Sequence, residues 1–171
     1  MNIKNIFSTF LLVISIATVS NAQKCHYDVD KKDPFSGTNE RRISETYNNY
    51  FTFAFYRSGD DFRLESYVNI PNDQAFIIPA GNKLTLKLTD GTTMELSSLN
   101  SATPQSYFVN LQIYSAYAMT YPITKEELKK IETIGIVFIR TYLKDESYYD
   151  MEIKKKKIEK LKNDARCIMA D

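Results

Sequence analysis

Few side chains in this sequence are suited to covalent or acid–base chemistry. The chain has two cysteines, Cys25 and Cys167, and a single histidine, His26, next to the first of them. Any histidine-dependent triad or dyad would have to use His26, and a multi-histidine metal centre is excluded. No glycine-rich phosphate loop, nucleophile-elbow, HExxH or CxxC pattern is present. The sequence therefore predicts no catalytic residue, no metal site, no cofactor and no enzymatic activity.

The two cysteines are expected to form a disulfide bond. Cys25 and Cys167 lie near opposite ends of the expected mature chain, and an oxidising compartment favours their pairing. Such a bridge would close nearly the whole chain into one loop, a constraint of about 5 kcal/mol in the chain-entropy account. The alternative is two free thiols too far apart to meet.

Paired carboxylates are the remaining route to catalysis, because two acids alone can hydrolyse a glycosidic bond. Adjacent acidic residues at 60–61 and at 145–146 are two candidate pairs. Both fall in predicted turns, where acidic side chains favour the turn and solubility. A small carboxylate-dependent hydrolase therefore stays an alternative function.

Three aspartates near the start of the mature chain are spaced closely enough to gather oxygen ligands for calcium. These are Asp28, Asp30 and Asp33. They lack the glycine and the distal glutamate of the twelve-residue calcium loop. The pattern favours a solvated acidic turn.

Residues 1–22 are typical of a secretory signal peptide. Lys4 precedes an uncharged, mostly apolar stretch over 6–19, and small residues at 20 and 22 mark a cleavage site before Gln23. The apolar stretch is shorter than the roughly 20 residues of a membrane-spanning helix, which disfavours a retained anchor. Lys24 directly before Cys25 disfavours lipid attachment. We expect residues 23–171 to form one exported domain in the periplasm, on the cell surface or outside the cell.

The expected mature chain has no net charge to attract a polyanion. Loss of Lys4 leaves its basic side chains equal in number to the 21 acidic ones. We therefore expect no nucleic-acid partner and no membrane contact after signal removal. The run of lysines over 154–157 indicates either the solvated face of a helix or a contact for an anionic glycan, lipopolysaccharide or membrane surface.

Hydrophobic alternation predicts mainly strands. Residues 50–56 and 62–70 alternate around a turn and predict a hairpin, and residues 84–88 and 94–96 predict another around Asp90-Gly91. Residues 24–42 are polar and expected to be irregular, with a turn at 33–37. Further strands are expected over 107–117, as one long strand, over 134–139, buried on both faces, and over 148–153.

Two helices complete the expected fold. Thr124 and Glu127 form a capping-box pattern, which predicts a short helix near 125–132. Spacings of three and four predict a C-terminal amphipathic helix that buries Ile158, Leu161, Ala165 and Ile168. The fold expected is mainly β, with α+β at the margin: an antiparallel β-sandwich or barrel-like sheet with these two helices.

The leading expectation for function is a non-enzymatic exported domain with a binding or structural role. Its candidate binding surface is Asn110, Gln112 and Tyr114, on the polar side of the strand expected over 107–117. Twelve tyrosines also favour an aromatic platform that stacks on peptide or sugar, although such residues are more often half-buried. The partner is an unknown protein or glycan. A secreted effector or inhibitor acting through the loop 97–105 is a further alternative.

Overall fold

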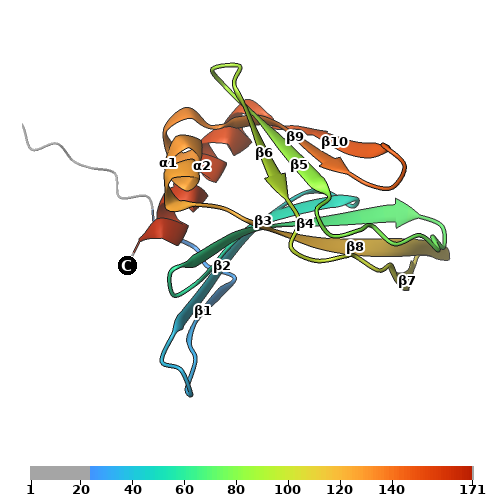
Figure 1. The fold of residues 1–171 in the computed structure, drawn as a ribbon, viewed down its shortest axis with the longest axis horizontal. Coiled ribbons are helices and arrows are strands. Elements are labelled where there is room, and N and C mark those ends of the chain that lie inside the picture. Colours follow the sequence, from blue (N-terminus) through green and yellow to red (C-terminus); the bar gives the residue numbers. More distant parts are fainter. Residues whose placement is uncertain (1–23, 171) are drawn as a thin grey trace, which may run out of the picture.

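The computed structural model describes residues 24–170 as two antiparallel sheets with two helices at one end (Figure 1). In Figure 1 the smaller sheet lies above the larger one, and both helices lie at the left. The predicted mainly-β, sandwich-like fold is confirmed. The predicted signal peptide, residues 1–22, lies outside the described residues.

The larger sheet has six strands, most of them neighbours along the chain. The predicted hairpin between 50–56 and 62–70 is confirmed, with Ser58 opposite Asp61 next to its turn. Two later strands extend the sheet beside its fourth strand. In sheet order the strands are β1 (Val29–Lys32), β2 (Asn39–Asn48), β3 (Phe51–Ser58), β4 (Asp61–Pro71), β8 (Gln112–Pro122) and β7 (Gln105–Val109).

The expectation that residues 24–42 are irregular is wrong, because they include β1 and the start of β2. Figure 1 shows this end of the sheet extending away from the second sheet, so β1 has no core behind it and no apolar alternation. The predicted turn is confirmed: the carboxylate of Asp33 accepts hydrogen bonds from the backbone of Phe35 at 2.8 Å and Ser36 at 2.6 Å.

The smaller sheet contains the predicted Asp90-Gly91 hairpin. In β9, Ile136 and Ile139 are fully buried and Phe138 is half-buried. The strand was expected to be buried on both faces, and it is fully buried on one face only. In sheet order the strands are β10 (Tyr148–Glu152), β9 (Ile136–Tyr142), β5 (Lys83–Leu88) and β6 (Thr93–Ser97).

Both predicted helices are present. α1 (Lys125–Ile134) begins with the predicted capping box: Thr124 Oγ1 accepts from the Glu127 N–H, and the Glu127 carboxylate accepts from the Thr124 N–H at 2.8 Å. α2 (Lys155–Met169) packs beside α1. Neither helix of the described chain combines the length and the hydropathy needed to cross a bilayer.

One continuous core lies between the two sheets and beneath α2. Side chains at alternate positions of β3, β4 and β8 pack against those of β5, β6 and β9, as the sequence periodicity predicts. The predicted stripe of α2 closes this core at one end, with Ile158 half-buried at its margin. The fully buried residues of that stripe are Leu161, Ala165 and Ile168.

Candidate functional site

The candidate surface lies on the β7–β8 hairpin, where the sequence indicated one long strand. β7 ends at Val109 and β8 begins at Gln112. Asn110 and Leu111 lie between them with φ of 49° and 63°, the two positive values of a type I′ turn. The expected strand over 107–117 is therefore wrong, because the chain reverses here. Asparagine tolerates positive φ, but leucine rarely adopts it, and no glycine marks the turn.

The reversal changes which side chains share a face. Tyr107 is opposite Tyr114 and Val109 is opposite Gln112, so these four lie on one face of the hairpin. Gln112 and Tyr114 are therefore together, as expected, and the Tyr114 hydroxyl donates to Gln112 Oε1 at 2.9 Å. Asn110 is not on this face with them, because it occupies the turn.

Large apolar side chains are exposed on both faces of the hairpin and at its tip. All of β7 is exposed, and the exposed fractions reach 63% at Phe108 and 91% at Leu111. Removing such side chains from water is favourable by about 1.5–3 kcal/mol each. Ten large apolar or aromatic side chains are exposed among the described residues, and half of them belong to this hairpin: Tyr107, Phe108, Val109, Leu111 and Ile113.

Three tyrosines form an aromatic cluster at the base of the hairpin. The rings of Tyr107 and Tyr114 stack with centroids 5.6 Å apart, and Tyr50 lies 6.2 Å from Tyr114. Two of the other tyrosines, Tyr117 and Tyr121, are buried in the core. The aromatic cluster at the base of the hairpin is continuous with its apolar tip.

The outer edge of β7 has no strand beside it. β7 is the last strand of its sheet, and within residues 24–170 only β8 pairs with it. In a two-residue hairpin the pair next to the turn is hydrogen-bonded and the following pairs alternate. The backbone groups of Ser106 and Phe108 consequently point away from β8. An unpaired edge of this kind is a template for another extended chain.

The loop 97–105, through which an inhibitor would act, is hydrogen-bonded to neighbouring segments. The Leu99 N–H donates to the Thr120 carbonyl at 2.8 Å, and Ala102 exchanges two backbone hydrogen bonds with Ile78. Ala102 is buried. The loop is thus held by its neighbours, as the inhibitor alternative requires, and Leu99 on it is 56% exposed. Five of the ten exposed large apolar side chains of the described residues nevertheless lie on the β7–β8 hairpin.

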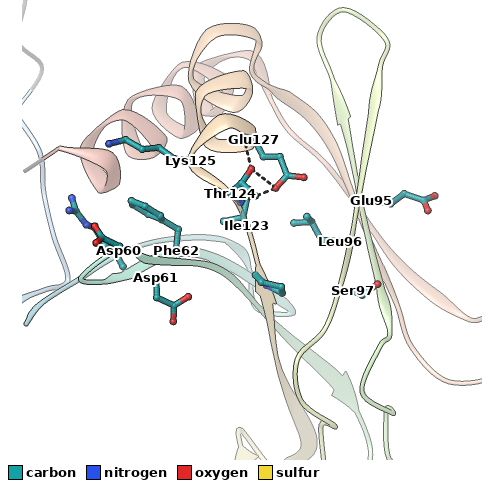
Figure 2. A pocket seen from close by; sticks show the side chains of 12 residues that line it. Asp60, Asp61, Phe62, Glu95, Leu96, Ser97, Ile123, Thr124, Lys125 and Glu127 are labelled. Carbon is teal, nitrogen blue, oxygen red and sulfur yellow. Dashed lines mark hydrogen bonds between the residues drawn. The ribbon is translucent and has the colours of Figure 1, made fainter.

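A cavity of about 690 Å³ between the β3–β4 turn, β6 and the start of α1 is lined by four acidic residues, Asp60, Asp61, Glu95 and Glu127. Figure 2 shows that the carboxylates of Asp61 and Glu95 point in different directions. Glu127 is hydrogen-bonded to Thr124 in the capping box. Hydrolysis by two carboxylates needs them to face each other across roughly 5–10 Å, and Asp61 and Glu95 do not face each other in this way.

The aspartates considered for calcium have other partners. Asp28 accepts a hydrogen bond from the Ser44 hydroxyl, Asp30 pairs with Arg41 at 3.2 Å, and Asp33 supports its turn. In the part of the chain that the structure describes, no group of three or more histidine, cysteine or acidic side chains is placed to hold a metal ion.

The predicted disulfide is present between Cys25 and Cys167, whose Cα atoms lie 5.6 Å apart. It joins the first described residues to α2. The Tyr27 hydroxyl adds a second link by donating to the Cys167 carbonyl at 2.9 Å. Both sulfur atoms are bonded, so neither is available as a thiolate nucleophile.

Buried charge beneath α2 is the feature that sequence reasoning missed. Glu45 of β2 is only 3% exposed and forms ion pairs with Lys157 and Lys160. Asp164 is 4% exposed, and burial raises its pKa to about 6. Burial, together with the nearby Asp164 carboxylate, also raises the pKa of Tyr47. The available signal was the position of Asp164 next to Ala165, inside the apolar stripe of the helix.

We expect Asp164→Asn to stabilise the protein at pH 7.5 by about 1–2 kcal/mol, less than the full linkage value because of solvent screening. Because the pKa of Asp164 is raised, its contribution to the free energy of unfolding is most favourable below pH 4. That contribution is lost as pH rises through about 6. Urea unfolding at pH 4.5, 6 and 7.5 measures this. An unchanged difference between variant and wild type across these three pH values would contradict it.

Comparison with protein families, with curated proteins and with solved structures found no match to this chain. The class of protein is therefore defined by the fold and the surface described above: a disulfide-closed, sandwich-like β domain with an apolar hairpin.

Proposed function

We propose that the protein is an exported, non-enzymatic binding domain that recognises a protein partner through the β7–β8 hairpin. The observation that carries this proposal is the gathering of five exposed large apolar side chains on one hairpin. Contiguous apolar surface of this kind is typical of interaction sites. The signal-peptide pattern of residues 1–22 and the disulfide both support a location outside the cytoplasm.

The proposed mode of recognition is strand addition. An extended segment of the partner pairs with the outward backbone groups of Ser106 and Phe108 at the edge of β7. Main-chain hydrogen bonds then supply affinity, and the apolar side chains on both faces of the hairpin supply specificity. The partner segment needs apolar side chains at alternate positions to cover them.

The chemistry of the surface favours a protein partner over a glycan. Sugars stack on flat aromatic rings, and the chain contains no tryptophan. The hairpin tip is aliphatic, with Val109, Leu111 and Ile113 exposed around the turn. Aliphatic side chains of this kind match the apolar side chains of another polypeptide.

We expect Leu111→Asp to lower the affinity for the partner at least tenfold and to leave folding unchanged. Leu111 is 91% exposed, so the substitution removes apolar contact with the partner and places a charge there, while the free protein loses no packing. The measurement is retention of the partner from the native extracytoplasmic fraction, followed by titration of the purified partner.

Phe35→Asp is the matched control. Phe35 is 99% exposed in the β1–β2 turn, away from the hairpin. The proposal requires Phe35→Asp to bind like the wild type. Equal binding by Leu111→Asp and the wild type, or loss of binding in the Phe35 variant, would overturn it.

A further inference from the structure

The four edge strands of the two sheets differ in charge. Charged side chains at an edge keep it from pairing with another sheet. Three edges have them: Asp30, Lys31 and Lys32 lie on β1, Glu95 on β6, and Asp150 and Glu152 on β10. β7 has none, and it lies within residues 96–124, the longest uncharged stretch of the chain. Among the sheets of the described residues, the β7 edge is therefore the one without a charge of its own.

The sequence of β7 has the alternation that this edge requires of a partner segment. Tyr107 and Val109 lie on one face of the strand and Phe108 lies on the other. Two copies of β7 placed antiparallel therefore cover each other's apolar side chains. The expected mature chain has no net charge, so two copies do not repel each other over long range.

The outward backbone groups of β7 fit one self-paired register best. With a two-fold axis at Tyr107, Ser106 of each copy lies opposite Phe108 of the other, and these pairs exchange four backbone hydrogen bonds. An axis at Ser106 places Phe108 opposite Pro104, which has no N–H to donate. An axis at Phe108 places Ser106 opposite Asn110, which has positive φ in the turn and is not extended.

This register joins the aromatic clusters of the two copies. Tyr107 lies opposite its own counterpart at the axis, and it already stacks on Tyr114 within each copy. The four rings therefore form one row across the pair. On the other face Phe108 lies diagonal to its counterpart, a separation that aromatic side chains can bridge.

The turn of each copy reaches the start of β7 in the other copy. Continuing the same register carries the turn residue Leu111 to Thr103 of the second copy. Thr103 lines a pocket of about 270 Å³ together with Gln105 and Ala116. Leu111 is the most exposed apolar side chain of the hairpin, so the pairing brings a protruding side chain to a hollow.

We infer that the partner at the β7 edge is a second copy of this chain, paired antiparallel about Tyr107. This inference rests on the proposed function, because it names the partner of the same hairpin. The pairing joins the six-stranded sheets of two copies into one continuous sheet. It uses the uncharged edge of each copy, and the edges that remain carry charges, so assembly closes at a dimer.

The exposed side chains of the hairpin set the strength of the pairing. With full areas of about 150–250 Å² for large side chains and exposed fractions of 38–91%, the five offer about 500 Å² on each copy. A standard interface buries about 800 Å² on each partner, and the paired backbone supplies part of the difference. We therefore expect a reversible dimer with a dissociation constant of about 10 μmol/L.

Sedimentation of the disulfide-bonded protein between about 1 and 200 μmol/L, on either side of this constant, measures the association. We expect monomer at the lower concentration and dimer at the higher. Phe108→Lys places like charges in the pairing and should weaken it at least tenfold. Phe35→Lys makes the same change in charge at a side chain that is 99% exposed in the β1–β2 turn, and it should associate like the wild type.

Asp73 brings one carboxylate to this edge, because it accepts a hydrogen bond from the Ser106 hydroxyl at 2.6 Å. The pairing places Ser106 of both copies on the same face, so the two Asp73 carboxylates approach each other. Asp73→Asn removes this repulsion and should tighten the dimer about threefold. Sedimentation of this variant over the same concentrations gives the comparison, and weaker association of Asp73→Asn would contradict the placement.

Cysteine cross-linking tests the register. Tyr107→Cys places two thiols at the axis, where opposite Cα atoms lie about 4.5 Å apart, within the range of a disulfide. We expect this variant to form a cross-linked dimer. Gln105→Cys is the matched control: Gln105 lies opposite Val109 of the second copy, so Gln105→Cys alone should not cross-link, and a mixture with Val109→Cys should.

Each result supports or overturns the pairing. A protein that stays monomeric at about 200 μmol/L, well above the expected constant, overturns it, and so does a dimer that Phe108→Lys leaves intact. Cross-linking of Gln105→Cys as fast as Tyr107→Cys overturns the register. A monomeric protein whose hairpin still retains a different polypeptide refutes the second copy alone. Hairpin variants that change neither self-association nor retention refute the proposed function as well.

Discussion

Replacing both Cys25 and Cys167 by alanine is expected to lower the free energy of unfolding by about 4–5 kcal/mol. The two residues are 142 positions apart in sequence, so their bond closes a loop that contains almost all of the described chain. A long loop removes more freedom from the unfolded chain than a short one. The expected loss is a large fraction of the stability of an ordinary domain. Urea unfolding of the oxidised wild type and the double variant measures it.

The control is reduction of the wild type. A phosphine reductant should move the unfolding midpoint of the wild type toward that of the double variant and leave the variant unchanged. A double variant as stable as the oxidised wild type would contradict the structural role given to the bond.

Gly135→Ala is expected to destabilise the protein by about 3 kcal/mol. Gly135 ends α1 with φ of 92° and ψ of 152°, a region that is essentially restricted to glycine. A Cβ atom there would also lie 2.7 Å from Ile158 Cγ2 and 3.1 Å from Lys162 Cδ. The substitution therefore combines backbone strain with an overlap between the α1–β9 connection and α2. Chemical unfolding is again the measurement.

Gly91→Ala provides the matched control for this substitution. Gly91 also has positive φ, at 87°, but nothing lies within 4 Å of an added Cβ. Only the backbone cost remains, and we expect a loss of about 1 kcal/mol. Equal losses of stability in the two glycine variants would contradict the overlap that we assign to the close approach of α2 to Gly135.

The parts of the fold that could be predicted are those in which a buried face repeats at the period of its element. Phe51, Phe53 and Phe55 alternate and are buried, and the capping box at Thr124 starts α1 as expected. β1 could not be predicted in this way, because it has polar residues and no core behind it. Sheet order, including the separation of β7 from β6 into different sheets, depends on contacts distant in sequence.

The residues of the candidate surface were assigned to one strand, and the structure places them on a hairpin. Gln112 and Tyr114 do share an exposed face, but the strand assumed to hold them reverses at Asn110. Apolar alternation over 107–113 favoured a strand with one buried face, and Leu111 was placed on that face. An exposed apolar hairpin has the same sequence periodicity as a half-buried strand. The tertiary structure separates the two, because within residues 24–170 the side chains of β7 are exposed.

These features connect the fold to the proposed function. The disulfide closes one end of the molecule, where α2 covers the core, and the other end presents the β7–β8 hairpin (Figure 1). We therefore expect the stability of the domain to depend little on the exposed hairpin side chains. Substitutions in the hairpin should affect binding, and substitutions at Cys25, Cys167 and Gly135 should affect stability.

Hydrogen exchange of the backbone amides of β7, with and without the purified partner, tests strand addition most directly. The amides of Ser106 and Phe108 point outward in the free protein and should exchange fast, and the partner should slow both at least tenfold. Tyr107, whose amide already pairs with β8, should change less. Unchanged exchange at Ser106 and Phe108 in a saturated complex would contradict recognition at this edge.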